Sequence, residues 1–292
     1  MDIKQELLTR KPNLSASSLK AYNSTLTNLH RNVFGNDDYS LDNFNNIDVI
    51  NDYLKDVPVN KRKTIYATLV SLTNNQLYRD RMLEDNENHN QIVETQTKTE
   101  AQQENWAEPQ TIQSTFDKLR NESKLLFKKE NKTIDDLQKI QNFIIVALTS
   151  GIYIPPRRAM DYTEFRIKNI NPDEDNYMNR KTFVFNRYKT AKSYGRQVVD
   201  IPVQLKNLIT KWMTVNPTDY LLFDSNMNKM TNVKLNQRMN KIFNGKIAIN
   251  AMRHSYLTDK YGTTSSEMND LAEDMTMMGS SILQQKEYIK LK

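Results

Sequence analysis

A polar stretch, residues 84–104, divides this chain. It consists largely of Asp, Glu, Asn, Gln and Thr and carries almost no apolar side chain. Because such a segment cannot bury a core, we expect an exposed linker, with frayed helix at most. A linker at this place predicts a helical domain over residues 1–83 and a second domain over residues 105–292. The chain of 292 residues is long enough for two cores.

The first domain shows the periodicity of amphipathic helices. Apolar residues recur at helical spacing over residues 19–33, after serines that can cap a helix and before Gly35, which ends the run. A shorter helix is expected over residues 47–54. A longer one is expected over residues 59–82, with Leu77 on its buried face. These patterns predict a small helical unit.

Three cations, Lys61, Arg62 and Lys63, lie in the first turn of the last of these helices. Cations at a helix N-terminus oppose the helix dipole, so their placement costs free energy unless a phosphate lies nearby. A phosphate contact and a solvated charged turn explain the cluster about equally well.

The second domain is predicted to be mainly α with a small antiparallel β-sheet, an α+β class. A helix capped by Thr133 is expected to run up to Gly151, and β-like runs follow over residues 164–170, 181–187 and 196–201. Further helices are expected from Pro202, over 231–242, over 250–261 before Gly262, and over 266–275. On the helix over 231–242, a solvated polar face is the expected place of Lys234, Arg238 and Lys241.

The positive charge belongs to the second domain. Residues 1–104 hold 12 Lys and Arg against 15 Asp and Glu; by difference from the totals of 41 and 35, the remainder holds 29 against 20. A net charge of +9 in that part suits a surface that binds a polyanion such as nucleic acid. The alternative is an AT-rich genome, which raises the share of Lys, Asn, Ile and Tyr without any function.

Composition excludes several other classes of protein. The chain has no Cys and only three His, so disulfides, thiolate catalysis, thiolate zinc sites and a His-rich metal site are not expected. No apolar run approaches 18 residues, and the N-terminal sequence lacks the apolar core of a signal peptide. We therefore expect an intracellular protein with no membrane partner.

Tyr288, close behind a Met-Gly-Ser-Ser turn, is the candidate nucleophile. A phenol ionises near pH 10, so attack on a phosphodiester needs cationic neighbours that activate the phenol and hold the phosphate. Upstream, Arg158 follows two prolines that keep the backbone extended, Lys189 lies in a turn-rich stretch between two β-like runs, and Arg253 lies on a helix. These three cations are the expected phosphate site.

Neighbouring polar residues complete this candidate site. Asp161 is one helical turn after Arg158 and is expected to pair with it; a plain surface ion pair is the alternative. Asn250 and His254 share one helix face with Arg253 by their spacing. A histidine at such a position is more often structural than catalytic, so a structural role is the favoured interpretation of His254. Lys192 in the loop of Lys189 and Arg196, which begins the next β-like run, are also expected to bind DNA, although hairpin loops are often basic for solubility alone.

The order of these residues resembles the tyrosine recombinase (phage integrase) family, most closely its giant-virus and virophage-like members. The resemblance covers roughly residues 105–290. The family runs an Arg with a following acidic residue, a Lys on a β-hairpin, a His-x-x-Arg helix, a Met-Gly-His-Ser-like turn and a Tyr. These positions are held here by Arg158, Asp161, Lys189, Arg253 and Tyr288. Two residues depart from the pattern: Asn250 stands where the family has His or Lys, and Ser280 where it has His or Trp.

The resemblance implies strand cleavage and rejoining of double-stranded DNA, without metal or nucleotide cofactor. Tyr288 would attack phosphorus to give a 3′-phosphotyrosyl link, Arg158 and Arg253 would hold the non-bridging oxygens, and Lys189 would protonate the departing 5′ oxygen. It also implies that both domains grip one duplex and that two or four protomers self-associate on paired sites.

Two alternatives remain open at this point. A type IB topoisomerase uses a similar Arg, Lys, Arg and Tyr set but works as a monomer. A DNA-binding or structural protein that kept the fold and lost the chemistry would explain the missing imidazoles at positions 250 and 280. The presence of the complete set Arg158, Lys189, Arg253 and Tyr288 favours an enzyme.

Overall fold

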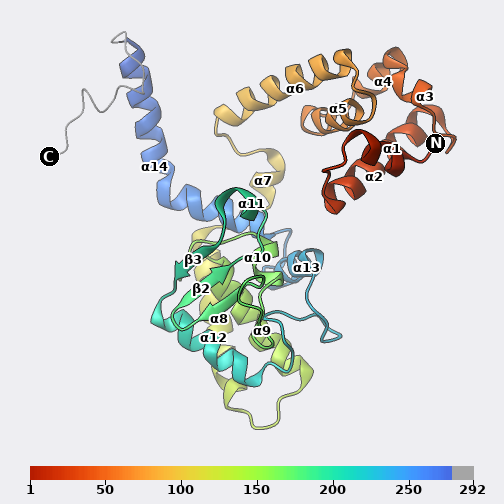
Figure 1. Ribbon diagram of the computed structural model, residues 1–292. Coiled ribbons are helices and arrows are strands. Elements are labelled where there is room, and N and C mark those ends of the chain that lie inside the picture. Colours follow the sequence, from red (N-terminus) through yellow and green to blue (C-terminus); the bar gives the residue numbers. More distant parts are fainter. Residues whose placement is uncertain (278–292) are drawn as a thin grey trace. The chain divides into compact units, whose positions relative to one another are not determined.

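The computed structural model describes the backbone of residues 1–277 and the side chains of residues 1–271. It divides into two compact units, Met1–Lys98 and Thr99–Lys292 (Figure 1). The described chain is mainly helical and has one three-stranded antiparallel sheet, which confirms the predicted α+β class. The division between the units falls inside the stretch predicted as a linker.

The first unit is a bundle of helices around its own core. Its helices are α1 Ile3–Arg10, α2 Ala16–Phe34, α3 Leu41–Asn45, α4 Ile47–Leu54, α5 Val59–Thr73 and α6 Gln76–Glu94. Helix α2 begins after Ser15, whose hydroxyl accepts from the backbone N–H of Ser18, and ends at Gly35, whose φ of 72° is left-handed. The helices predicted over residues 19–33 and 47–54 are therefore confirmed.

The single helix predicted over residues 59–82 is wrong, because two helices occupy that stretch. Asn74 adopts φ 54° and ends α5, and the side chain of Asn75 accepts from the N–H of Leu77 at the start of α6. Asn tolerates the left-handed region and offers a capping oxygen, which apolar periodicity does not reveal. Leu77, expected on the buried face, is 57% exposed.

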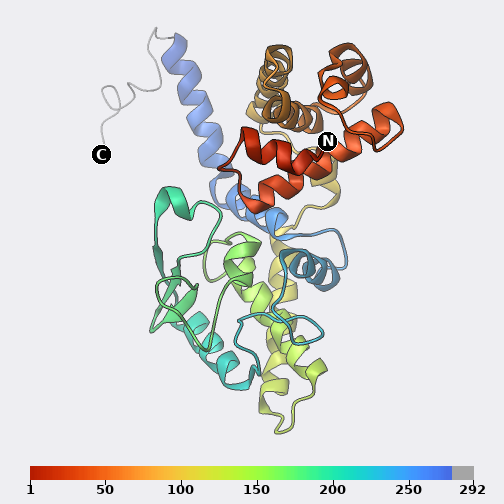
Figure 2. The same ribbon diagram turned by 45° about the vertical axis from the view of Figure 1, so that its right-hand side comes forward.

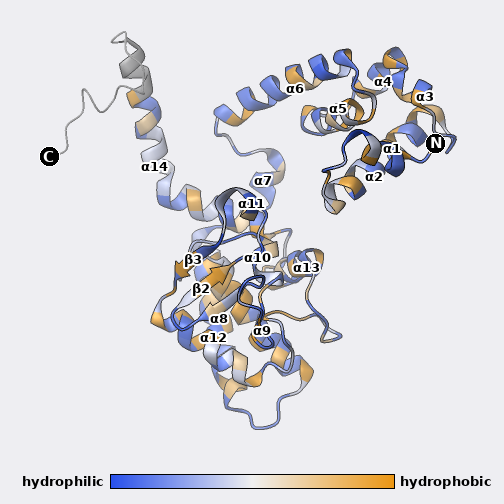
Figure 3. Cartoon of the chain, viewed as in Figure 1, coloured by the Kyte–Doolittle hydropathy of each residue, from blue (hydrophilic) through white to orange (hydrophobic). Residues whose placement is uncertain are grey.

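The predicted linker is mostly helical. Helix α6 continues to Glu94, and α7 Glu100–Glu104 follows with a capping box between Thr99 and Gln102. Asp85, inside the predicted linker, is buried against α5. Figure 3 shows α6 as a largely hydrophilic helix. Polar composition predicts exposure here, but Asp, Glu and Gln also suit an exposed helix face.

The second unit is built around two long helices, α8 Pro109–Lys128 and α9 Ile134–Thr149, which pack side by side (Figures 1 and 2). The predicted cap of α9 is confirmed, because Thr133 and Asp136 form a capping box. Besides α7, which also belongs to this unit, its described helices are α10 Ala159–Thr163, α11 Ala191–Tyr194, α12 Val203–Val215, α13 Asn232–Ile242 and α14 Ile249–Met277. The last two turns of α9 are buried on every side, so α9 is the centre of this core.

The sheet has the order β1-β2-β3, with β1 Tyr177–Asn179, β2 Thr182–Phe185 and β3 Gln197–Asp200. Strands β2 and β3 pair antiparallel, as the runs over 181–187 and 196–201 predicted. The strand predicted over 164–170 is wrong: that run makes only isolated bridges to distant loops, and β1 takes its place. The apolar side chains of Phe165 and Ile167 are buried in the core, although this run does not form the hydrogen-bond ladder of a strand.

Helix α14 runs without a break through Gly262, so the two separate helices predicted there are wrong. Gly262 lacks the positive φ that would end a helix. A glycine inside a helix costs only about 1 kcal/mol, which a long helix tolerates. The first turns of α14 bury Ile249 and Met252, whereas Leu257 and Tyr261 further along the helix are exposed. Among the described residues, no helix is long and apolar enough to cross a membrane.

Candidate functional site

The corner between α9 and α10 carries the first candidate arginine. Pro155 and Pro156 keep this stretch out of a helix, and Arg158 has extended backbone as the N-cap residue of α10. Its carbonyl accepts from the N–H of Asp161, which turns the chain into the short helix. Local sequence thus presents Arg158 from a stiff corner, as predicted.

A pocket of about 360 Å³ opens at this corner. Its charged lining residues are Arg157, Arg158, Asp161 and Arg253. Arg253 comes from the second turn of α14, so two arginines distant in sequence meet at one cavity. The structure therefore brings three of the predicted site residues together.

The β2–β3 loop contributes the wall of the same pocket. Tyr188 and Thr190 line it, and Lys189, which lies between them, has an exposed side chain. The predicted turn-rich stretch joins the antiparallel strands β2 and β3, and α11 forms one helical turn within it. Tyr188 is buried, and its hydroxyl donates to the carbonyl of Gly195 at 2.6 Å, which closes the loop. Lys189 is thus attached to an ordered loop beside the pocket.

The expected ion pair between Arg158 and Asp161 is wrong. Asp161 pairs with Arg157, whose Nε lies 2.7 Å from Oδ2 of Asp161. The i,i+4 geometry of Arg157 and Asp161 allows this pair, whereas Arg158 makes no side-chain hydrogen bond or ion pair within residues 1–271. The guanidinium of Arg158 is therefore available to an anion in the pocket.

Two buried polar atoms at this pocket have no hydrogen-bond partner among the described residues: Oδ1 of Asp161 and Nε of Arg253. Each such atom typically costs about 1–3 kcal/mol. Burial raises the pKa of Asp161, although the charges of Arg157, Arg158 and Arg253 act in the opposite direction. Unpaired polar groups at a cavity are a common sign of a site that a ligand completes.

The remaining predicted site residues of the second unit do not line the pocket or lie outside the described part. Asn250 and His254, in the first turns of α14, are exposed and do not line it. Lys192 is exposed on α11, and Arg196, also exposed, donates to the hydroxyl of Tyr177 at 3.0 Å. Ser280 and Tyr288, the predicted turn residue and nucleophile, lie outside the described residues.

In the first unit the three predicted cations have different environments. Arg62 forms two hydrogen bonds with the buried Asp85, at 2.8 and 2.6 Å, and so joins α5 to α6. Lys61 is exposed, and Lys63 is half-buried. Only these two lysines of the cluster remain candidates for a phosphate, since Arg62 is held by Asp85.

Sequence reasoning missed a groove of about 340 Å³ between α2 and α5. Lys61 lines it together with amide and hydroxyl side chains. The sequence feature that could have predicted this groove is the spacing of Thr25, Asn28 and Asn32, which puts three polar side chains on one face of α2. Amides and hydroxyls suit hydrogen bonding with a polar surface.

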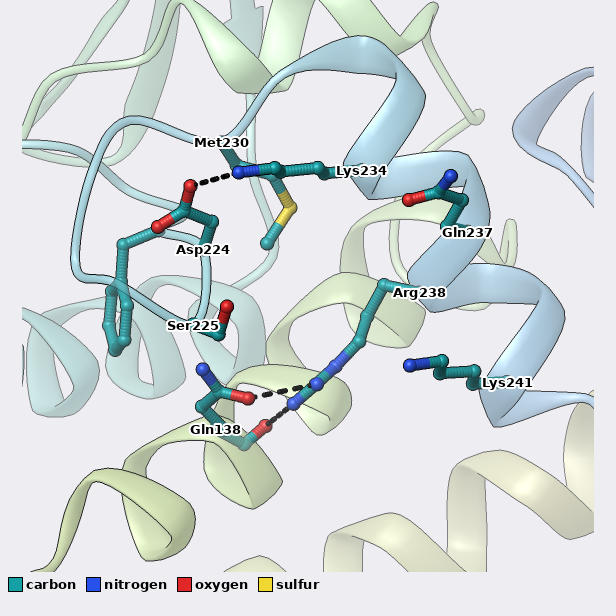
Figure 4. Close-up of a pocket in the computed structure, with 9 residues that line it drawn as sticks. Gln138, Asp224, Ser225, Met230, Lys234, Gln237, Arg238 and Lys241 are labelled. Carbon is teal, nitrogen blue, oxygen red and sulfur yellow. Dashed lines mark hydrogen bonds and ion pairs between the residues drawn. The ribbon is translucent and has the colours of Figure 1, made fainter.

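A second pocket, about 180 Å³, shows that α13 is not merely a solvated charged helix (Figure 4). Lys234 pairs with Asp224 at 2.5 Å, and Arg238 donates to Gln138 and to Asn142 of α9. Burial lowers the pKa of Arg238. The expected solvated face is therefore wrong for Arg238, which ties α13 to the central helix, and holds for the exposed Lys241.

In comparisons with known proteins, no family model and no curated protein matches the chain. Within the described residues, no group of three or more His, Asp or Glu side chains could hold a metal ion.

Proposed function

We propose that this chain cleaves and rejoins double-stranded DNA through a 3′-phosphotyrosyl intermediate, as in site-specific recombination or integration. The observation that carries the proposal is the meeting of Arg158 and Arg253 at one pocket, beside the loop of Lys189. A single anion in that pocket can contact two guanidinium groups that come from separate elements. The charge of +9 on residues 105–292 supports a polyanionic substrate.

The two arginines are suited to the phosphate and its transition state. Their planar, forked donors match two oxygens of one phosphate, and their charge stabilises the negative charge that grows on phosphorus. Arg158 has no competing carboxylate among the described residues, since Asp161 is occupied by Arg157.

In the proposed step Tyr288 supplies the nucleophile. A bond forms between its phenolic oxygen and phosphorus, the bond between phosphorus and the 5′ oxygen breaks, and the phenol proton leaves to solvent. Lys189 gives a proton to the departing 5′ oxygen. Attack by the freed 5′ hydroxyl then reverses the step, so rejoining needs no cofactor.

The side chains of Asn250 and Ser280 can donate and accept hydrogen bonds, but they do not take up and release a proton near neutral pH as the imidazoles of the family that the chain resembles do. We infer that this enzyme cleaves DNA more slowly than members of that family that have the imidazoles. The same replacements favour a second candidate, a DNA-binding protein that keeps the fold and lacks the chemistry. A type IB topoisomerase is the third, and relaxation of supercoils by a monomer without site dependence would identify it.

In this proposal, residues outside the pocket also contact the DNA. Lys61 and Lys63 of the first unit and Lys192 and Arg196 of the β2–β3 loop would contact phosphates of the same duplex, with self-association on paired sites. A nicked suicide duplex that contains the chain's target site, analysed on a denaturing gel, tests the proposal. A covalent protein–DNA adduct supports it, and its absence favours the DNA-binding candidate.

A further inference from the structure

Arg157 joins three elements of the second unit. Its Nε donates to Asp161 of α10 at 2.7 Å, and its Nη2 donates to Oε1 of Gln197, the first residue of β3, at 2.9 Å. Its guanidinium carbon lies 3.9 Å from the ring centroid of Phe185 at the end of β2. One side chain thus connects the corner before α10 with both strands that carry the β2–β3 loop.

Both ends of the loop that holds Lys189 rest on this arginine. At one end, Tyr188 lies with its ring centroid 5.4 Å from the guanidinium carbon of Arg157. At the other end, Gln197 accepts the hydrogen bond from Arg157 just after Gly195, whose carbonyl accepts from Tyr188. The position of Lys189 relative to the pocket therefore depends on Arg157.

The backbone of Arg157 is fixed as firmly as its side chain. Its N–H donates to the hydroxyl of Tyr162 at 2.8 Å, and that hydroxyl donates to the carbonyl of Leu148 on α9 at 2.7 Å. Tyr162 is fully buried, and burial raises the pKa of its phenol, so it remains a neutral donor. The residue that follows is Arg158, whose corner is thus anchored to the central helix.

Arg157 is itself poorly placed to bind substrate. Its side chain is only 19% exposed, and Asp161 balances its charge. A lysine could not replace it, because one ammonium group cannot reproduce the planar fork that joins a carboxylate, an amide and an aromatic ring.

We propose that Arg157 is the positioning residue that holds the Lys189 loop against the Arg158 corner, so that proton donor and phosphate clamp face one phosphodiester. The catalytic part of this inference rests on the proposed function. The structural part, the coupling of loop to corner, does not.

Amide hydrogen exchange on the full chain tests the coupling without any DNA. Arg157→Gln and Gln197→Ala should both speed exchange over residues 188–197 and leave α9 protected. Val198→Ala is the matched control, because Val198 is the exposed neighbour on β3. Exchange over 188–197 that is unchanged in both variants, or a loss of protection that spreads equally to α9, would overturn the coupling.

A leaving-group substitution tests the catalytic part. On an ordinary suicide duplex, Arg157→Gln and Arg157→Lys should both slow adduct formation by about 100-fold, the effect of misplacing a reacting group by about 1 Å. When sulfur replaces the bridging 5′ oxygen, the thiolate leaves without a proton. Arg157→Gln and Lys189→Ala should then both recover most of their rate, whereas Arg158→Ala should not.

The outcomes separate the two proposals. An equal defect of Arg157→Gln on the oxygen and sulfur substrates would overturn a role through Lys189. Arg157→Lys at full rate would show that charge alone suffices and would also overturn it. If the unaltered chain forms no adduct on either substrate, the proposed function fails, and with it the catalytic part; the exchange experiment still decides the coupling.

Discussion

Asp161 binds the Nε of Arg157 at 2.7 Å and leaves the adjacent Arg158 without an ion pair among the described residues. Two neighbouring arginines therefore have different tasks: one is neutralised and held inside the unit, and the other faces the pocket with its charge free. This division leaves Arg158 as the arginine of the corner that suits the proposed contact with phosphate, and Asp161 supports the corner through Arg157.

The ion pair between Arg62 and Asp85 makes Arg62 a structural residue. Its side chain is 23% exposed and that of Asp85 is 4% exposed. Arg62→Ala should therefore lower the free energy of unfolding of the first unit by about 3 kcal/mol, as for the loss of one partner of a buried pair. Urea denaturation monitored by circular dichroism measures this change. Lys63→Ala is the control, and equal stability of the two variants would contradict the assignment.

DNA affinity should depend on the two free lysines of that turn and on salt. The double variant Lys61→Glu, Lys63→Glu should keep its stability and lose affinity for duplex DNA, with a shallower dependence of log K on log salt. Fluorescence anisotropy over a salt series measures both quantities. Affinity that stays flat between low and moderate salt in the unaltered chain would count against DNA as the partner.

The capping box of α9 predicts a specific pH dependence. Hydrogen bonds from Lys129 and Thr133 lower the pKa of Asp136 to about 2. Because its folded-state pKa is depressed, Asp136 stabilises the fold above its unfolded pKa of about 3.9, and this contribution is lost as pH falls toward 2. Asp136→Asn should lower the Tm at pH 7, and the difference in Tm from the unaltered chain should shrink between pH 4 and about pH 2.

Thermal scans at a series of pH values test this prediction, with Asp135→Asn, on the exposed side of α9, as the control. A difference that does not vary with pH would exclude the ion pair as its cause.

Much of this fold is predictable from local sequence, because the signals are local. Thr133 with Asp136 marks a helix start, and Gly35 marks a helix end. The break at Asn74 escaped prediction, since the apolar residues before and after it continue at helical spacing and an asparagine does not by itself end a helix. Gly262 misled in the opposite direction, because a glycine permits a break without requiring one.

The candidate site was predictable in its members and not in its pairings. Arg158, Asp161 and Arg253 were named from residue type and order, and they meet at one pocket. That Arg157 takes Asp161 depends on Gln197 and Phe185, which approach from strands distant in sequence. Spacing along the chain holds no information on such contacts.

Restoring imidazoles should speed the proposed reaction. General acid–base catalysis typically contributes about 100- to 10,000-fold in rate, and the double variant Asn250→His, Ser280→His should recover part of that factor. Adduct formation on a suicide duplex over a pH series measures the gain. Asn250 is exposed, so the fold should tolerate the larger side chain there. A well-folded double variant that gains no rate would show that other groups already carry the protons or that the site is inactive.

The central claim is that Tyr288, and none of the other thirteen tyrosines of the chain, becomes joined to a DNA 3′ phosphate. The direct measurement is mass spectrometry of peptides from the adduct trapped on a suicide duplex, with Tyr288→Phe beside the unaltered chain. Removal of one oxygen should leave folding and DNA affinity nearly intact and abolish the adduct, whereas Arg158→Ala should slow adduct formation and also weaken binding. The account predicts a phosphotyrosyl peptide that contains Tyr288. An adduct that persists in Tyr288→Phe, or none at all from the unaltered chain on its true site, would contradict it.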